Sequence, residues 1–137
     1  MSDDKSVAQG ATAKAPRVAG PGEYFFEMIK VDAVLGGPDY SSAIGPAIVG
    51  DRMMTGLMRM PAGTGSDPHS HPNEQWIFVI EGNLEMNVGE TSQVAAPGTV
   101  IYIPSDIVHN AKVHGDADVV FFTVKDTSHG LHGIKQG

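Results

Sequence analysis

The feature that most constrains the fold is a series of short apolar runs broken by glycine and proline. The segment QWIFVIE at Gln75–Glu81 is rich in aromatic and β-branched residues, and TVIYIP at Thr99–Pro104 and DVVFFTVK at Asp118–Lys125 are similar. The chain contains 17 glycines and 9 prolines, which favour turns. Such punctuated runs are typical of a sandwich or barrel, so we predict an all-β chain of roughly eight to ten strands without helices.

Three other segments give less direct signals. YFFEMIK at Tyr24–Lys30 is predicted to be a strand. DRMMTGLMRMP at Asp51–Pro61 is methionine-rich, but its short length and the glycine and proline at its ends favour a strand over a helix. Its Met54, Met58 and Met60 share one face and either fill the core or line an apolar pocket. Gly82-Asn83 between two strand-like runs predicts a tight hairpin.

Length and composition limit the number of domains and the classes of partner that we expect. The 137 residues suit one domain, which we divide into a flexible N-terminal arm at 1–22 and a single barrel at 23–137. An alternative is that the arm crosses to a partner subunit. A net charge of −7 argues against a nucleic-acid partner, and no apolar stretch approaches the length of a membrane span. Without cysteine or an apolar leader segment, a cytoplasmic location is expected.

The segment PHSHPNEQW at Pro68–Trp76 concentrates polar groups beside a predicted strand. Side chains two apart on an extended chain share a face, so His69, His71 and Gln75 are expected to project together. Glu74 has the opposite parity and should point away, unless Pro72 shifts the register. Imidazole binds zinc, copper, iron and nickel, usually within sets of three or four ligands. The alternative is a solvated loop.

Four histidines remain as possible further ligands. His109 ends the segment YIPSDIVH, which follows on from an apolar predicted strand, so pairing of that strand with the His69–Gln75 region can bring it to the first two histidines. His114 is expected at the surface. His129 and His132 lie in the tail DTSHGLHGIKQG, which is either solvated or closes over the barrel mouth.

These motifs give the chain a resemblance to the cupins, the double-stranded β-helix or jelly-roll family. The first cupin motif is matched from Gly63 through His69 and His71 to Gly82, with Gln75 where the family normally has glutamate. The second motif begins at Gly98 and is matched at Pro104 and His109. Asp106 and Val113 replace its glycine and its asparagine.

The resemblance implies a divalent transition metal bound by His69, His71, Gln75 and His109. Iron is the first expectation, with zinc, nickel, copper or manganese as alternatives. The amide of Gln75 is neutral, so such a site leaves the charge of the ion uncompensated and should favour anionic ligands. A carboxylate from Glu74 is the alternative fourth ligand, if the strand shifts register.

The resemblance also implies several activities. The first expectation is a dioxygenase-type oxidoreductase. Separately from the resemblance, an apolar interior lined by methionine and isoleucine favours a small aromatic or carbonyl compound over a highly hydroxylated sugar as the substrate. The second is a redox-neutral isomerase, lyase or cyclase in which the ion polarises a carbonyl, with Glu74, Tyr102 or His114 as the catalytic base. The third is a non-catalytic binding protein.

A homodimer is also expected, because homodimers are common in the resembled family. Trp76 and Phe78 have the parity opposite to Gln75, so they should lie outside the barrel, where they form a dimer surface or pack under loops. The predicted strand Tyr24–Lys30 offers an edge for exchange between subunits.

Overall fold

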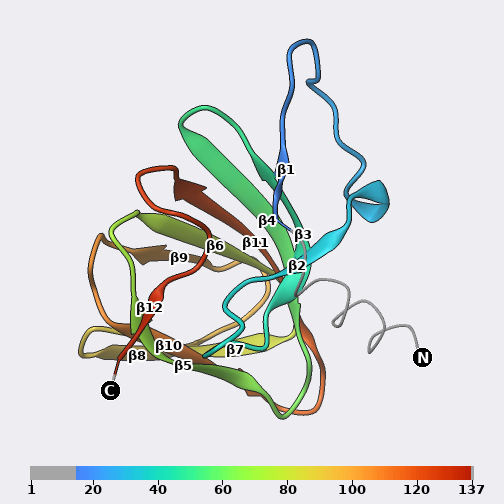
Figure 1. Cartoon of the computed structure of the whole chain (residues 1–137). Helices are drawn as coiled ribbons and strands as arrows, with labels where there is room; N and C mark the ends of the chain where they lie inside the picture. The colour runs from blue at the N-terminus through green and yellow to red at the C-terminus, as the bar shows by residue number, and fades with distance from the viewer. Residues whose placement is uncertain (1–14, 137) are drawn as a thin grey trace.

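The computed structural model describes residues 15–136, which form two β-sheets facing each other in a closed roll (Figure 1). No α-helix occurs among these residues, so the predicted all-β jelly roll is confirmed. No helix of the described part is long and apolar enough to span a membrane. The seven-stranded sheet has the order β1-β3-β4-β11-β6-β9, with β2 paired to β3. Its strands are β1 (Arg17–Val18), β2 (Ala33–Leu35), β3 (Ile44–Val49), β4 (Met53–Met60), β6 (Gln75–Glu81), β9 (Val100–Ile103) and β11 (Val119–Asp126).

The five-stranded sheet has the order β12-β5-β10-β7-β8. Its strands are β5 (Gly65–Ser70), β7 (Asn83–Val88), β8 (Thr91–Ala95), β10 (His109–His114) and β12 (Ile134–Lys135). The predicted strands at Asp51–Pro61, Gln75–Glu81, Thr99–Pro104 and Asp118–Lys125 therefore exist, with ends within two residues of those expected.

The core lies between the two sheets and follows the two-residue periodicity of the strands. In β6, Gln75, Ile77 and Val79 are buried, while the residues between them are exposed. In β4, Met54, Met58 and Met60 are buried. Met58 and Met60 also line an internal cavity. These two methionines therefore both fill the core and line an apolar pocket, the two roles expected from the sequence.

The predicted hairpin at Gly82-Asn83 is wrong. Strand β6 pairs with β9 and β11, whereas β7 pairs with β8 and β10 in the other sheet. Gly82 is therefore a corner at which the chain crosses between sheets. Its φ of +77° is in the left-handed region, and a Cβ there would collide with the main-chain oxygen of Asp118. Local sequence shows that a turn is needed but not which strands will pair.

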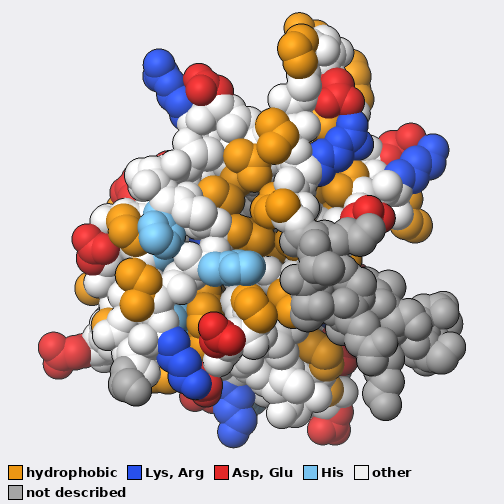
Figure 2. All heavy atoms as spheres, viewed as in Figure 1, with side chains coloured by type: hydrophobic (Ala, Val, Ile, Leu, Met, Phe, Trp, Pro, Cys, Tyr) orange, Lys and Arg blue, Asp and Glu red, His pale blue; other side chains and the backbone are white. Residues whose placement is uncertain are grey.

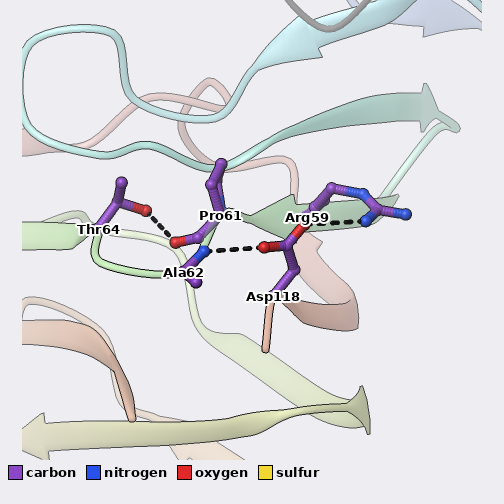
Figure 3. Close-up of polar contacts among 5 residues, drawn as sticks. All are labelled: Arg59, Pro61, Ala62, Thr64 and Asp118. Carbon is purple, nitrogen blue, oxygen red and sulfur yellow. Dashed lines mark hydrogen bonds and ion pairs between the residues drawn. The ribbon is translucent and has the colours of Figure 1, made fainter. Parts of the chain in front are cut away.

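A second crossing joins β4 to β5 and delivers the strand that carries His69. Asp118, just before β11, accepts a hydrogen bond from the Ala62 N–H (2.9 Å) and another from the Arg59 guanidinium (3.1 Å; Figure 3). Thr64 Oγ1 donates to the Pro61 carbonyl (2.6 Å) and tightens the turn. These contacts fix where β5 starts relative to β11.

The prediction of a strand at Tyr24–Lys30 is also wrong. Met28–Lys30 form a short 3₁₀ helix, and the preceding residues have no regular structure. Phe25 and Ile29 are almost fully exposed, so no packed neighbour of the described chain holds this segment in a sheet. Of the predicted arm at 1–22, residues 1–14 lie outside the described residues, and Arg17–Val18 pair in parallel with β3.

Candidate metal centre

Three histidines from distant parts of the sequence meet inside the roll. His69 lies on β5 opposite His109 at the start of β10, and His71 follows β5 directly. Their exposed fractions are 8%, 3% and 1%, respectively. Each offers a ring nitrogen, and the three nitrogens lie within 4.8 Å of one another. The three buried histidines are therefore positioned to bind a metal ion.

The backbone sets the orientation of all three rings in the same way. Each Nδ1 lies at hydrogen-bond distance from a carbonyl two residues away: His69 and Asp67 O (2.7 Å), His71 and Asn73 O (2.8 Å), His109 and Ile107 O (2.9 Å). A carbonyl only accepts, so each Nδ1 carries the proton and each neutral ring keeps its Nε2 lone pair free. The Nε2 of His109 is buried and has no hydrogen-bond partner in the described part of the chain, as expected of an atom that binds a metal ion.

The amide of Gln75 completes the set. Thr123 Oγ1 donates to the Trp76 carbonyl (2.9 Å), so it accepts from the Gln75 amide nitrogen (2.8 Å). This leaves Gln75 Oε1 facing His71 Nε2 at 3.1 Å. Two lone pairs then face each other in a buried site, an arrangement that repels unless a cation lies between them. Two ligand atoms that each bind one ion at about 2.1 Å lie no more than about 4.2 Å apart, and this spacing is within that limit.

Burial also keeps the imidazoles in the state that metal binding needs. Desolvation lowers the pKa of His69 to about 4 and that of His109 to about 3, and it lowers the pKa of His71 as well. The rings are therefore neutral at physiological pH without help from an ion. The residues present thus fit a divalent transition metal, which they would bind through three imidazole nitrogens and one amide oxygen.

Lys125 shares this site and was missed in the sequence analysis. It lies on β11 directly opposite Gln75 and is only 6% exposed. Its ammonium donates to the Leu131 carbonyl (2.6 Å), and burial lowers its pKa to about 8. The signal was present in the sequence, because Lys125 has the same parity as the inward Phe121 and Thr123 of an otherwise apolar strand.

Three of the four candidate ligands, His69, Gln75 and His109, line a cavity of about 60 Å³. One buried water needs roughly 10–15 Å³, so the cavity has room for a few atoms of a ligand. Its polar wall includes His69, His109, Gln75, Thr123 and Lys125. The remaining wall is mainly apolar and includes Met58, Met60, Ile77, Leu84, Met86 and Phe121.

The C-terminal segment closes one side of this cavity. This is one of the two arrangements expected for the tail from its sequence. Leu131 is buried and lines the cavity, and β12 pairs with β5 beyond it. Tyr40 stacks on His69 with ring centroids 4.1 Å apart and accepts from the Gly133 N–H (2.6 Å). Figure 2 shows the surface of the molecule from the same side as Figure 1, with histidine side chains lying among hydrophobic side chains.

Hydrogen bonds to main-chain carbonyls hold the C-terminal segment in place. The buried Asn73 amide donates to the carbonyls of Asp126 (3.1 Å) and Gly130 (3.2 Å). His129 is half-buried, and His132 is exposed with its Nε2 at 2.8 Å from the Leu35 carbonyl. Neither ring lines the cavity.

The structure does not bring the three proposed bases to the cavity. Glu74 points outward, as its parity predicts, and accepts a hydrogen bond from the Tyr102 hydroxyl. Tyr102 stacks against Trp76 on the outer face of the roll, with ring centroids 4.6 Å apart. His114 is exposed at the end of β10. None of them lines the cavity next to His69 and His109.

The chain matches the cupin domain family over residues 56–125, just over half of its 137 residues. The chain belongs to the cupin family. The matched region contains the three histidines, Gln75 and Lys125. An uncharacterised protein of Streptomyces coelicolor is 38% identical to this cupin over 58 residues, which cover 42% of this chain and 54% of that protein. The match thus spans about half the length of that curated relative.

Solved structures with the same fold include an RmlC-like cupin from Shewanella frigidimarina and the polyketide cyclase RemF from Streptomyces resistomycificus. The first has a TM-score of 0.67 at 16% identity and covers 79% of this chain and 94% of its own. The second has a TM-score of 0.66 at 19% identity and covers 75% and 78%. At these identities the likeness shows the fold alone.

The second cupin motif departs from the family pattern at Asp106 in a way the structure explains. Asp106 occupies the glycine position and has a φ of 63°, which aspartate tolerates better than most side chains. Its main-chain N–H donates to the His71 carbonyl (2.8 Å). The substitution therefore keeps the turn, and the main chain of the turn contacts a candidate metal ligand as a glycine there also would.

Proposed function

We propose that this cupin is a metalloenzyme of the dioxygenase type, in which His69, His71, His109 and Gln75 bind a divalent transition metal, preferably iron. The observation that supports a metal at this site is the convergence of free lone pairs. Gln75 Oε1 faces His71 Nε2 at 3.1 Å, and His109 Nε2 is buried without a hydrogen-bond partner among residues 15–136. The substrate is a small organic molecule, because the adjoining cavity measures about 60 Å³.

The protein contributes position and exclusion of water. Backbone carbonyls hold the three rings by Nδ1, and Thr123 holds the Gln75 amide, so little reorganisation is needed when the ion binds. An iron ion held by the three imidazoles and the Gln75 amide would supply the electrons that activate oxygen. The apolar walls around Met58, Met60 and Phe121 favour an apolar substrate body.

A redox-neutral isomerase, lyase or cyclase is the second candidate. It is favoured by the charge of the site, because all four ligands are neutral and Lys125 adds positive charge to the same cavity. Such a site stabilises the negative oxygen that develops when a carbonyl compound is converted to its enolate.

The identity of the bound metal, measured together with oxygen consumption, separates these functions. The protein is purified without added metal, its metal content is measured by mass spectrometry, and oxygen uptake is followed with a panel of small phenols and diketones. Bound iron with substrate-dependent oxygen uptake is the expected result. Zinc or nickel with turnover in the absence of oxygen would favour the redox-neutral candidate. A bound metal without turnover of any panel member would favour a binding protein.

A further inference from the structure

We propose that Lys125 selects an anionic substrate, and that the site takes a small carboxylate or enolate with a short apolar body. The anionic group would bind between the Lys125 ammonium and the metal position. This inference rests on the proposed metal site and specifies the substrate class of that site.

Lys125 is buried, and no carboxylate of the described residues balances its charge. Its side chain is 6% exposed, and the hydrogen bond to the Leu131 carbonyl uses one of its three N–H groups. Among the described residues, no carboxylate forms an ion pair with Lys125, and none lines the cavity. Burying an ammonium without a counter-charge is unfavourable, so the site has an unmet preference for an anion.

Lys125 also lies close to the proposed metal position. Lys125 and Gln75 are opposite each other on paired strands, and both side chains line the cavity. Residues paired in this way have their Cβ atoms about 5 Å apart on the same face of a sheet. A carboxylate or enolate oxygen at this end of the cavity therefore lies within reach of both the ammonium and an ion held by Gln75 and the histidines.

The apolar side chains of the cavity determine which kind of body the anionic ligand can have. Met58, Met60, Met86 and Phe121 line the apolar part of the cavity. A highly hydroxylated ligand would leave hydroxyl groups unpaired against these side chains. The small volume further restricts the ligand to a short body.

A purely structural role does not account for the choice of lysine. The Leu131 carbonyl needs only one hydrogen-bond donor, which a neutral glutamine or a water also supplies. The positive charge is therefore the property of Lys125 that this contact does not use.

The test compares propionate with its neutral analogue propionamide. The full-length protein is loaded with Co²⁺, whose visible spectrum responds to ligands, and affinities are measured by spectral titration and calorimetry. The variants are Lys125→Met and Lys125→Gln. Lys112→Met is the matched control, because Lys112 is exposed on β10 and its replacement changes the net charge equally. Thermal unfolding confirms that each variant is folded.

We expect the wild type and Lys112→Met to bind propionate at least about tenfold more tightly than propionamide. Both Lys125 variants should keep their cobalt and lose most of that preference, retaining only the part that the ion itself provides. Equal propionate affinity in the wild type and both Lys125 variants would overturn the inference, as would a wild type that does not discriminate. If the wild type binds no cobalt, the proposed metal site fails separately. The same titration of metal-free protein then decides whether Lys125 recognises the anion, by loss of the preference in the variants.

Discussion

The amide of Gln75 has nearly the shape of a carboxylate but lacks its charge. In this cupin the amide cannot simply rotate, because Thr123 accepts a hydrogen bond from its nitrogen and directs its oxygen toward His71. The neutral ligand set and the nearby Lys125 together make the site more positive than one closed by glutamate. The preference for anions is thus a property of two residues on paired strands.

Gln75→Glu should tighten divalent-metal binding by about tenfold or more and weaken binding of small anions to the metal-loaded protein, because the added charge offsets that of the ion. Competition with a chromogenic chelator measures the first effect, and propionate titration measures the second. Weaker metal binding in the variant would remove Gln75 from the ligand set.

Acid should destabilise the metal-free protein. The pKa values of His69 and His109 are lowered by burial to about 4 and about 3, below the value of about 6.5 in the unfolded chain. Between these limits the unfolded chain binds more protons, so stability is complete above about pH 6.5 and falls as the pH drops toward 4. Denaturant unfolding of chelator-treated protein at pH 7.5, about 6 and about 5 should show a loss of a few kcal/mol.

His109→Gln removes one of these titrating groups, so its stability should depend less steeply on pH. A metal-free wild type whose stability is unchanged, or rises, on acidification would contradict this account of the buried imidazoles.

Side-chain parity predicted the inward face of His69, His71 and Gln75, because burial alternates from residue 69 to residue 75 even where the chain leaves β5 and crosses to β6 in the other sheet. The same rule applied to β11 would have identified Lys125. Tyr40 was beyond such reasoning, because it reaches His69 from a loop whose path depends on the whole fold.

At the scale of elements, the crossings between sheets decide where the ligands lie. The sequence signals for individual strands were local and correct for β4, β6, β9 and β11. Pairing was not local: Gly82 marks a corner between sheets rather than a hairpin, because β6 finds partners in β9 and β11. The segment Tyr24–Lys30 has strand-like composition, but Tyr24, Phe25 and Ile29 are exposed, so packing within the described part of the chain does not hold it in a sheet.

Gly82→Ala tests the corner, with Gly63→Ala as the matched control. Both glycines have positive φ, of +77° and +80°, but only at Gly82 would a Cβ collide with another part of the chain, the main chain before β11. Gly63→Ala should lower the free energy of unfolding by about 1–2 kcal/mol from backbone strain alone. Gly82→Ala should lower it by about 1–3 kcal/mol more, as measured by denaturant unfolding. Equal losses would mean that the close approach at the corner is unimportant.

At the scale of the whole molecule, the cavity side of the seven-stranded sheet is covered and part of its outer side is not. Trp76, Phe78, Val100 and Tyr102 form an outer aromatic face across the paired strands β6 and β9, and each is at least 40% exposed. A contiguous apolar face of this kind is typical of a protein interface. We propose that it joins two copies of the chain.

The double variant Trp76→Glu/Phe78→Glu should shift the protein from dimer to monomer in light scattering, because four added charges would face one another across the interface. Phe25→Glu is the control, since Phe25 is 95% exposed but lies outside the outer aromatic face. A dimer that survives the double variant and dissociates in Phe25→Glu would place the interface on the N-terminal segment. A monomeric wild type would exclude the proposed dimer.

The metal content of purified protein tests the central claim most directly. His109→Ala removes the buried Nε2 that lacks a partner, and His114→Ala, on the same strand but exposed, is the matched control. We predict one transition-metal ion per chain in the wild type and in His114→Ala, and loss of most of the metal in His109→Ala, with all three proteins folded. Full occupancy in His109→Ala, or no metal in the wild type after incubation with iron, zinc, nickel, copper and manganese, would contradict the account.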